Sequence, residues 1–319
     1  MSNTSFYDKI PFTCNTSYDP VVEIFKYIIQ CVYLLLGGIL MIHMLYIIAV
    51  RHKSSYIPNT YFQIFIFELI TSIYLVFHDI FFGRLTLYVT PLCPIIGPYF
   101  YDYSLFLKFS MVSTSYVRSS KTVSQIFLTF NRLTCVFFPL KHSKYWEKLI
   151  IPVIIANIIL PFGSIWSLIL SRVYASSTYG GFSTSYIRAI EWASLSGLQF
   201  IYLTISLIIS TINSLATLYA LKIRSYRILH LERMLCIATL FSTACSVIVG
   251  SVQYVWVFCT VCKIDTKPLY GIQLVNVDIP IIGTPIMMII VNAKLRSDMF
   301  SRFHKESVTV VNSMTENRV

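Results

Sequence analysis

Seven long, predominantly apolar stretches run along this chain, and no other feature constrains its fold as strongly. Hydrophobic residues make up 56% of its 319 residues and charged residues only 12%, whereas a soluble domain carries roughly 25% charged residues. Four stretches contain no Lys, Arg, Asp or Glu: residues 27–50, 149–170, 192–221 and 234–262. Each can cross roughly 30 Å of hydrocarbon as a helix. Because lipid offers the backbone no hydrogen-bonding partner, each stretch is predicted to be helical.

The other three stretches carry charged residues inside the apolar run, namely Glu68, Asp79, Arg118, Lys121, Arg132 and Asp278. With these included, the sequence predicts an all-α membrane protein, a seven-transmembrane helix bundle. The predicted helices cover about residues 24–50, 59–82, 103–138, 149–170, 193–221, 234–261 and 268–291. After them, residues 292–303 predict a short amphipathic helix on the inner membrane surface, with Phe300 and Phe303 toward lipid.

Three regions are predicted along the chain. They are an extracellular N-terminal tail (1–23), a seven-helix transmembrane domain with its inner-surface helix (24–303), and a disordered cytoplasmic tail (304–319). The first 20 residues hold no apolar run of the signal-peptide kind, so we expect the first helix to act as its own insertion signal. Acceptor triplets at Asn3 and Asn15 predict glycosylation of the N-terminal tail.

The net charge of +11 is interpreted as a sign of membrane orientation. With the N-terminus outside, eight of the 25 Lys and Arg residues fall on the outer side. These are Lys9, Lys26, Arg84, Lys108, Arg172, Arg188, Lys263 and Lys267. Arg118 and Lys121 lie within the third helix, and the remaining fifteen lie on the inner side. This excess obeys the positive-inside rule. We therefore expect a multi-pass cell-membrane protein in a lipid bilayer, with no nucleic-acid partner.

The third predicted helix carries a polar stripe. Its members recur at spacings of three or four, which stacks them on one helical face: Thr114, Arg118, Lys121, Gln125, Thr129 and Arg132. Exposing Arg or Lys to lipid costs at least ~2.5–3.5 kcal/mol each, so the stripe should face the bundle interior and the helix should be central. From the helical rise, Lys121 lies roughly 16 Å and Arg118 roughly 21 Å above Arg132.

Arg118 and Lys121 admit two interpretations. In the first, they bind a small anionic ligand, with Thr114 and Gln125 on the same stripe. Arg would supply a bidentate fork for an acid group, and the abundant Tyr and Phe residues of neighbouring helices would supply apolar walls. An amphipathic acid would suit such a pocket.

The second interpretation is internal neutralisation. Glu68 and Asp79 lie in the second predicted helix and Asp278 in the seventh. Any of them could pair with the bases of the third helix, because a charge inside a membrane bundle normally finds a partner. Under this interpretation Arg118 and Lys121 are structural, and the sequence leaves both alternatives open.

Two motifs indicate the class of protein. Asn131-Arg132-Leu133 ends the third helix, and Pro139 follows eight residues after the asparagine. The tripeptide stands where rhodopsin-like receptors carry Asp-Arg-Tyr, with a proline at the same distance. In the seventh helix, Thr284-Pro285-Ile286-Met287-Met288 resembles their Asn-Pro-x-x-Tyr segment. More closely, the run from Phe130 to Pro139 after a polar third helix resembles the nematode serpentine receptors of class gamma, over about residues 20–305.

This resemblance implies a G-protein-coupled chemosensory receptor for a small, amphipathic and anionic cue, such as a fatty-acid-like pheromone. It implies a heterotrimeric G protein as partner and the sensory cilia of chemosensory neurons as location. The residues assigned to G-protein coupling are Asn131, Arg132 and Leu133. The candidates for a buried polar switch are Glu68, Asp278, Thr284 and Pro285.

The chain departs from the rhodopsin-like pattern in several ways. Asn131 cannot hold the charge of the usual acid, and Met288 replaces the tyrosine. The outer loop after the fourth helix contains no cysteine, so the usual bridge from the third helix to that loop cannot form. Four other cysteines lie near the outer face, where disulfides persist, and their pairing stays open: Cys14, Cys93, Cys259 and Cys262.

Other classes of function are favoured less. A small-solute transporter or a ligand-gated channel would also carry polar residues at mid-membrane, but no internal repeat is visible. An enzyme is not expected, since His43 and His78 lie in different helices without metal-ligand spacing. No cofactor or metal is expected. The seventh helix has no lysine at mid-depth, which argues against retinal.

Overall fold

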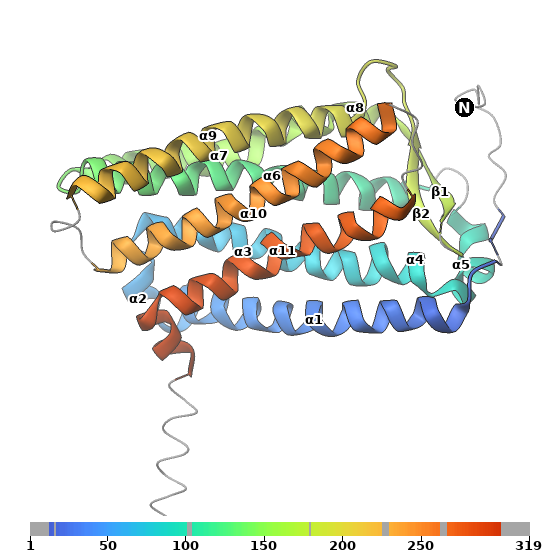
Figure 1. Cartoon of the computed structure of the whole chain (residues 1–319), viewed down its shortest axis with the longest axis horizontal. Coiled ribbons are helices and arrows are strands. Elements are labelled where there is room, and N and C mark those ends of the chain that lie inside the picture. The colour runs from blue at the N-terminus through green and yellow to red at the C-terminus, as the bar shows by residue number, and fades with distance from the viewer. Residues whose placement is uncertain are drawn as a thin grey trace, which may run out of the picture.

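The computed structural model describes residues 13–15, 17–100, 104–178, 180–224, 230–261 and 267–300. Asn3, Cys262, Phe303 and the predicted tail 304–319 lie outside the described residues, as does much of the basic segment 222–233. Long helices run side by side in one bundle (Figure 1). In chain order the helices and strands are α1 (Pro20–Tyr46), α2 (Lys53–Tyr56), α3 (Thr60–His78), α4 (Leu85–Tyr88), α5 (Cys93–Phe100), α6 (Leu105–Phe137), α7 (His142–Ile159), α8 (Phe162–Leu170), β1 (Arg172–Thr178), β2 (Gly181–Ile187), α9 (Leu195–Arg224), α10 (His230–Val261) and α11 (Lys267–Val291).

Six segments of the described chain are long and apolar enough to cross a membrane: Pro20–Arg51, Thr60–Tyr88, His142–Leu170, Leu195–Ile223, Arg233–Val255 and Gly271–Val291. Their outward faces carry many exposed Ile, Leu, Val and Phe side chains. Such a continuous apolar surface is unstable in water but is what lipid requires. The predicted helical membrane bundle is therefore confirmed.

Helix α6 is the longest of the described helices, with 33 residues, but it is too polar to count among these six segments. It packs against α3, α7, α8, α9 and α10, which places it in the middle of the bundle (Figure 1). Its buried residues include many hydroxyl-bearing side chains, among them Ser110, Thr114, Ser119, Ser120 and Thr129. The polar stripe thus faces other helices, as its periodicity predicts.

The second span continues beyond its predicted end at residue 82. After α3, the backbone forms a π-helical turn over Asp79–Arg84 before α4 begins. In a π-helix the hydrogen bonds join residues five apart, so such residues share a face. Asp79 and Arg84 are five apart, and both are buried. The placement of Arg84 in an outer loop was therefore wrong.

The fourth span begins earlier than predicted and is broken. Helix α7 starts at His142, and a turn at Leu160 and Pro161 separates it from α8. Trp146 of α7 is fully buried, and its indole Nε1 donates to Thr134 Oγ1 at 2.8 Å. This hydrogen bond ties the start of α7 to the inner end of α6.

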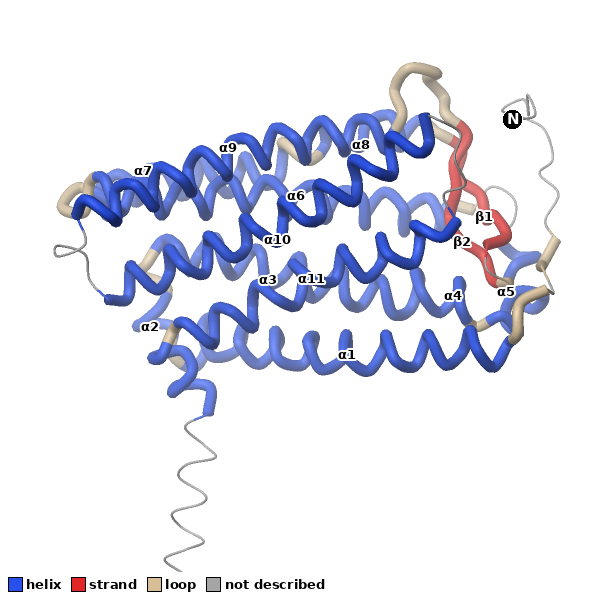
Figure 2. Tube along the Cα trace, in the orientation of Figure 1, coloured by secondary structure: helices blue, strands red, loops and turns tan. Residues whose placement is uncertain are grey.

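The loop predicted between the fourth and fifth helices contains an antiparallel hairpin. Strands β1 and β2 pair from Arg172↔Ile187 to Thr178↔Gly181, and they lie at one end of the bundle (Figure 2). Gly180 in the turn has φ of 80°, a left-handed conformation that glycine adopts without strain. The next residue, Gly181, lies against the carbonyl oxygens of Thr86 and Leu87, where a Cβ would clash.

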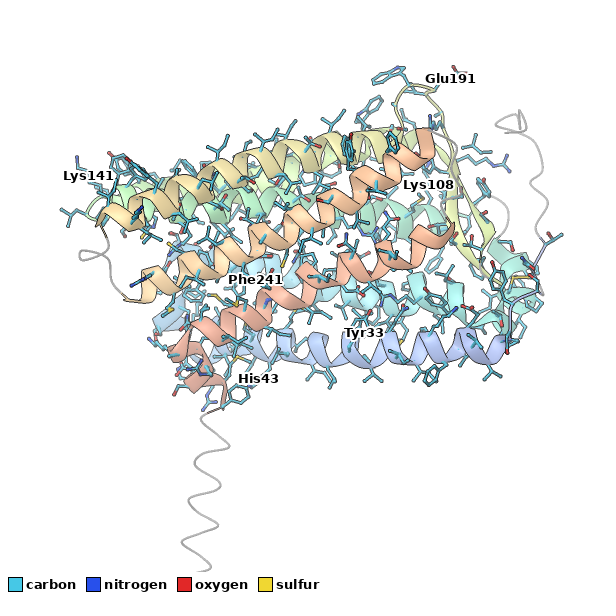
Figure 3. The ribbon with its side chains drawn as sticks, viewed as in Figure 1. Tyr33, His43, Lys108, Lys141, Glu191 and Phe241 are labelled. Atoms are coloured by element: carbon cyan, nitrogen blue, oxygen red, sulfur yellow. A yellow bond between two sulfur atoms is a disulfide. The ribbon has the colours of Figure 1, made fainter. Side chains whose placement is uncertain are left out.

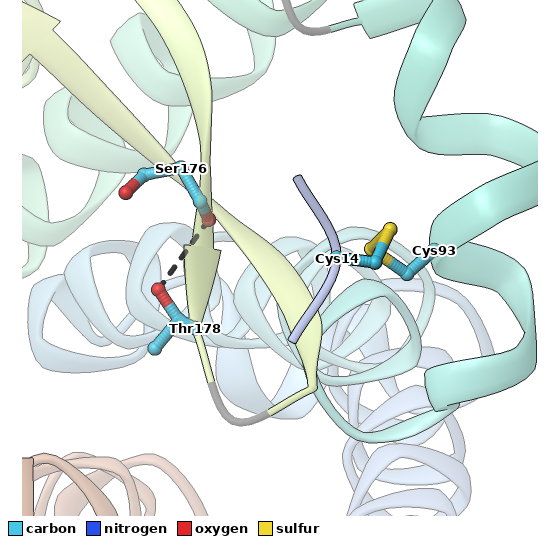
Figure 4. Close-up of a disulfide and its surroundings, with 4 residues drawn as sticks. All are labelled: Cys14, Cys93, Ser176 and Thr178. Carbon is cyan, nitrogen blue, oxygen red and sulfur yellow. Dashed lines mark hydrogen bonds between the residues drawn. A yellow bond between two sulfur atoms is a disulfide. The ribbon is translucent and has the colours of Figure 1, made fainter. Parts of the chain in front are cut away.

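A disulfide joins the N-terminal segment to the same end of the molecule. Cys14 is bonded to Cys93 at the start of α5, across 79 positions of sequence (Figure 4). Both cysteines pack with Val173 and Phe182 of the hairpin. The structure thus selects one pair from the four candidate cysteines. The side chain of Cys259 lies outside the described residues.

At the opposite end of the bundle, the chain turns after α11 into a short helix over residues 293–300. Asn292 caps it, because its Oδ1 accepts the N–H of Leu295 at 3.0 Å. Leu295 and Met299 are buried in the main core, whereas Phe300 is exposed. Figure 3 shows Lys141 at this end of the bundle and Glu191 at the hairpin end.

Candidate ligand cavity and inner end of α6

A cavity of about 340 Å³ lies between α3, α6, α9, α10 and α11, with strand β2 contributing to its wall. Its polar lining consists of Glu68, Arg118, Ser119, Lys121, Thr122, Gln125, Ser196, Gln199, Ser206, Ser210, Ser242, Ser246, Gln253 and Gln273. Its apolar and aromatic lining consists of Leu75, Tyr186, Leu195, Tyr202, Leu203, Leu207, Val249, Val277, Pro280 and Ile281. A cavity that combines an apolar wall with convergent polar groups is typical of a small-molecule site, and this one is rich in polar groups.

Lys121 is held firmly on one wall of this cavity. Its Nζ lies 3.2 Å from Glu68 Oε1 and donates to Ser72 Oγ at 2.6 Å. The Lys121 side chain is 14% exposed and the Glu68 side chain 4%. A buried ion pair with an additional hydrogen bond neutralises both charges, so Lys121 ties α6 to α3.

Arg118 lies one turn before Lys121 in α6, and its ionic contact is longer and more exposed than that of Lys121. Its Nη2 lies 3.5 Å from Asp79 Oδ1, and its side chain is 41% exposed. Its Nε is buried and makes no hydrogen bond. Asp79 also lies 3.8 Å from His78 Nδ1. The Arg118 guanidinium therefore reaches the cavity with much of its donor capacity unused.

Gln125 connects the cavity to the neighbouring helices. Its Oε1 accepts from Ser242 at 2.8 Å and its Nε2 donates to Thr243 at 3.3 Å, both on α10. Ser242 in turn accepts from Thr284 of α11 at 3.3 Å, and Thr243 shares a hydrogen bond with Ser214 of α9 at 3.1 Å. Four helices thus meet through one buried amide, whose oxygen and nitrogen each make a hydrogen bond in this arrangement.

A second buried ion pair lies near the cavity. Arg84 Nη2 donates to both carboxylate oxygens of Asp278 at 2.6 Å, and Tyr33 donates to Asp278 Oδ2 at 2.5 Å. Arg84 Nη1 also donates to the Tyr33 hydroxyl at 2.9 Å. These contacts join α1, the π-helical turn and α11. Asp278, one of the three carboxylates considered as partners for the third helix, is bound by Arg84 instead.

Near the C-terminal end of α6, which was predicted to be its inner end, Arg132 is buried. Its Nη2 donates to Asn131 Oδ1, and its guanidinium lies 4.4 Å from the centre of the Tyr61 ring. Asn131 Nδ2 donates to Thr60 Oγ1 at 3.1 Å. The inner end of α6 is thus bound to the start of α3 by polar and cation–π contacts.

Comparison with known proteins identifies the family to which this arrangement belongs. The family model described as "Srg family chemoreceptor" matches residues 27–299. The chain belongs to the Srg family of chemoreceptors.

Relatives of this Srg chemoreceptor are similar along nearly its whole length. Serpentine receptor class gamma-13 of Caenorhabditis elegans is 39% identical over 319 residues, covering 100% of this chain and 95% of the relative. Serpentine receptor class gamma-16 of the same organism is 39% identical over 79% of this chain and 78% of the relative. Serpentine receptor class gamma-11 is 35% identical over 94% and 89%. The resemblance inferred from the third helix is therefore confirmed.

The structure brings together only part of the predicted site of the Srg chemoreceptor. Arg118, Lys121 and Gln125 line one cavity together with Glu68. Thr114 lies outside that lining, and its hydroxyl donates to the Ser110 carbonyl within α6 at 2.8 Å. The remaining predicted residues lie elsewhere. Thr284 is bonded to Ser242 next to Gln125, Pro285 lies within α11, and Asp278 pairs with Arg84. Leu133 is half-buried near the C-terminal end of α6, and Asn15 follows the disulfide-bonded Cys14.

The sequence analysis did not predict the cavity walls that α9 and α10 contribute. On α9, a polar face begins with Ser206 and Ser210 in the cavity wall and extends to the buried residues Asn213, Ser214 and Thr217. Their spacings of three and four are the signal that identified the stripe on α6. The same criterion, applied to the uncharged stretches, would have found this second polar face. Among the described residues, no group of three or more His, Cys, Asp or Glu could hold a metal ion.

Proposed function

We propose that this Srg chemoreceptor is a G-protein-coupled receptor that binds a small amphipathic acid from outside and signals to a cytoplasmic heterotrimeric G protein. The observation that carries the proposal is the Arg118 guanidinium, which lies at a cavity of about 340 Å³ with only one long ionic contact. A guanidinium at a cavity wall with free donors suits an acid group in bidentate geometry.

The two bases of α6 have different roles in this proposal. Lys121 is a structural residue, because Glu68 and Ser72 already satisfy it. Arg118 is the ligand-binding residue, because its contact with Asp79 is long, at 3.5 Å, and its side chain is 41% exposed. The ligand-binding interpretation therefore applies to Arg118, and the internal-neutralisation interpretation applies to Lys121.

The rest of the ligand would lie against the apolar wall. Leu203, Leu207 and Val249 provide that wall from α9 and α10, and Tyr186 of the hairpin stands at the outer end. Gln125 forms the inner limit of the cavity, so a bound ligand would press on the hydrogen bonds that join α6, α10 and α11. Such contact offers a route from ligand binding to helix movement.

In this proposal the chain crosses the membrane seven times, through the six apolar segments and α6. Its N-terminus lies outside the cell. A polar helix can span the membrane when surrounding helices cover it, as α3, α7, α9 and α10 cover α6. Because Arg84 is buried, it no longer counts among the basic residues of the outer loops. The excess of Lys and Arg on the inner side is therefore larger than the count from the sequence. Location in sensory cilia is part of the same proposal, by family resemblance.

For coupling, we assign the inner end of α6 to the G protein. Arg132 is covered by α9 and α10, which leave no room for a water molecule around Thr129, Arg132 and Thr239. Separation of those helices would expose Asn131-Arg132-Leu133, and Lys141, Lys144 and Lys148 beside it would favour an acidic docking surface. The helix over residues 293–300 is proposed to lie at the inner membrane surface.

Arg118→Gln tests the ligand site. In cells that express the receptor and report calcium, this variant should reach the surface normally and lose potency toward an acid agonist by one to two decades. That loss corresponds to a charge-assisted hydrogen bond worth roughly 1.5–3 kcal/mol. Lys121→Gln is the matched comparison: it strands Glu68, so its surface level should fall instead. Unchanged potency in well-expressed Arg118→Gln would refute the proposed site.

A further inference from the structure

We infer that the cue is a zwitterion: its acid group binds Arg118, and an amino group on the same molecule binds Glu68. The inference rests on the proposed function, since it takes the cavity as the ligand site. It adds a second charged group to the ligand and gives Glu68 a direct role in recognition.

Glu68, one of the residues that line the cavity, has a carboxylate oxygen without a hydrogen-bonding partner. Its Oε1 is bound by Lys121 at 3.2 Å, but its Oε2 is buried and has no hydrogen-bonding partner. The residue is 3% exposed and lines the cavity. A carboxylate oxygen removed from water without a partner costs free energy, so the site favours a ligand that donates a hydrogen bond to it.

The charges around the cavity already sum to zero. Glu68 and Asp79 carry two negative charges, and Arg118 and Lys121 carry two positive charges. Within the membrane span, a ligand that is only an acid would add an uncompensated charge, which is costly in a low-dielectric environment. A zwitterion satisfies Arg118 and Glu68 together and keeps the site neutral.

The two anchors are close enough for one small molecule. Arg118 and Lys121 are three residues apart on α6, a rise of about 4.5 Å, and Glu68 is bound to Lys121. Two more residues of the cavity lining each have a buried polar atom without a hydrogen bond: Gln199 Nε2 and Ser210 Oγ. These atoms can form additional hydrogen bonds with a polar ligand. The apolar wall accommodates a short hydrocarbon chain.

Three probes of equal chain length test this inference on the purified full-length receptor in detergent. They are 2-aminooctanoic acid, octanoic acid and octylamine, and the measurement is the dissociation constant of each. The amino acid should bind about ten- to a hundredfold more tightly than octanoic acid, the range for one charge-assisted hydrogen bond. Octylamine should bind more weakly than the amino acid, because it leaves Arg118 unused.

The variant Glu68→Gln/Lys121→Met removes both members of the ion pair, so neither charge is stranded. It should bind 2-aminooctanoic acid no more tightly than octanoic acid. Glu23→Gln is the matched control. Glu23 is also buried, is paired with a lysine (Lys26, at 2.6 Å) and has an unpartnered Oε2, but it lies near the start of α1, away from the cavity lining. This control should keep the full preference for the amino acid.

Equal affinity for 2-aminooctanoic acid and octanoic acid in the unmodified receptor would overturn the inference. A preference that survives in Glu68→Gln/Lys121→Met would also overturn it. If Arg118→Gln still weakens octanoic acid in these cases, the proposed ligand site stands without the amino-group contact. If no probe binds, or if Arg118→Gln alters the affinity for none of them, both the site and the inference are wrong.

Discussion

Arg84 and Asp278 form an ion pair that is enclosed on all sides by the bundle. The Arg84 side chain is fully buried, and the Tyr33 hydroxyl bridges both partners. Neither charge can reach water, so each depends on the other for its solvation. The pair also holds α1, the π-helical turn and α11 in one register, which fixes one edge of the ligand cavity through Val277 and Pro280.

Asp278→Asn should therefore destabilise the receptor strongly. The substitution keeps the shape of the side chain but leaves Arg84 as a buried, unpaired charge, at a cost of about 3–5 kcal/mol. Thermal unfolding of the purified receptor should show a lower midpoint, and the surface level should fall. Arg84→Met combined with Asp278→Leu should recover much of the loss, because no charge is then stranded. Unchanged stability in Asp278→Asn would contradict the assigned pair.

At the scale of elements, α6 connects the proposed ligand cavity to the proposed G-protein surface. Its outer half lines the cavity through Arg118 and Gln125, and its inner end holds Arg132 against Tyr61 of α3. The hydrogen bonds from Gln125 to α10, and onward to Thr284 of α11, lie between these ends. Movement of α10 away from α6 would break them and uncover Arg132.

Arg132→Ala should abolish signalling while ligand binding persists. The side chain would no longer be available to the proposed G-protein surface, and the lost contact with Tyr61 is a buried cation–π interaction of about 2 kcal/mol. Calcium response, surface staining and affinity for the acid probe should be measured together. Arg296→Ala is the matched control, since Arg296 is exposed at the same end and donates to its neighbouring Ile290 carbonyl. Normal signalling by Arg132→Ala would refute the assignment.

At the scale of the whole molecule, the two ends of the bundle are built differently. One end carries the hairpin and the Cys14–Cys93 disulfide, a bond that persists in oxidising surroundings. The other carries the short helix over residues 293–300, whose Asp298 accepts from the Tyr56 hydroxyl at 2.6 Å. Burial and this hydrogen bond raise the pKa of Tyr56, so it stays a neutral donor across the physiological range.

The disulfide end is expected to face the outside of the cell. Asn15 should then be glycosylated, and an epitope tag placed after Val319 should bind antibody only in permeabilised cells. Endoglycosidase treatment should increase the electrophoretic mobility of the receptor, and Asn15→Gln combined with Asn3→Gln should remove that shift. Staining of the tag on intact cells would reverse the topology and contradict the assigned G-protein surface.

The sequence by itself determined the membrane environment, the helical class, the central polar helix and the family. Hydrophobic length and helical periodicity are local properties, so a stripe such as Thr114 to Arg132 can be read without coordinates. Only the tertiary structure decided which charges meet. Lys121 pairs with Glu68, Arg118 weakly with Asp79, and Arg84 with Asp278. These pairs join helices far apart in sequence, and two of them use residues of a π-helical turn that no local pattern revealed.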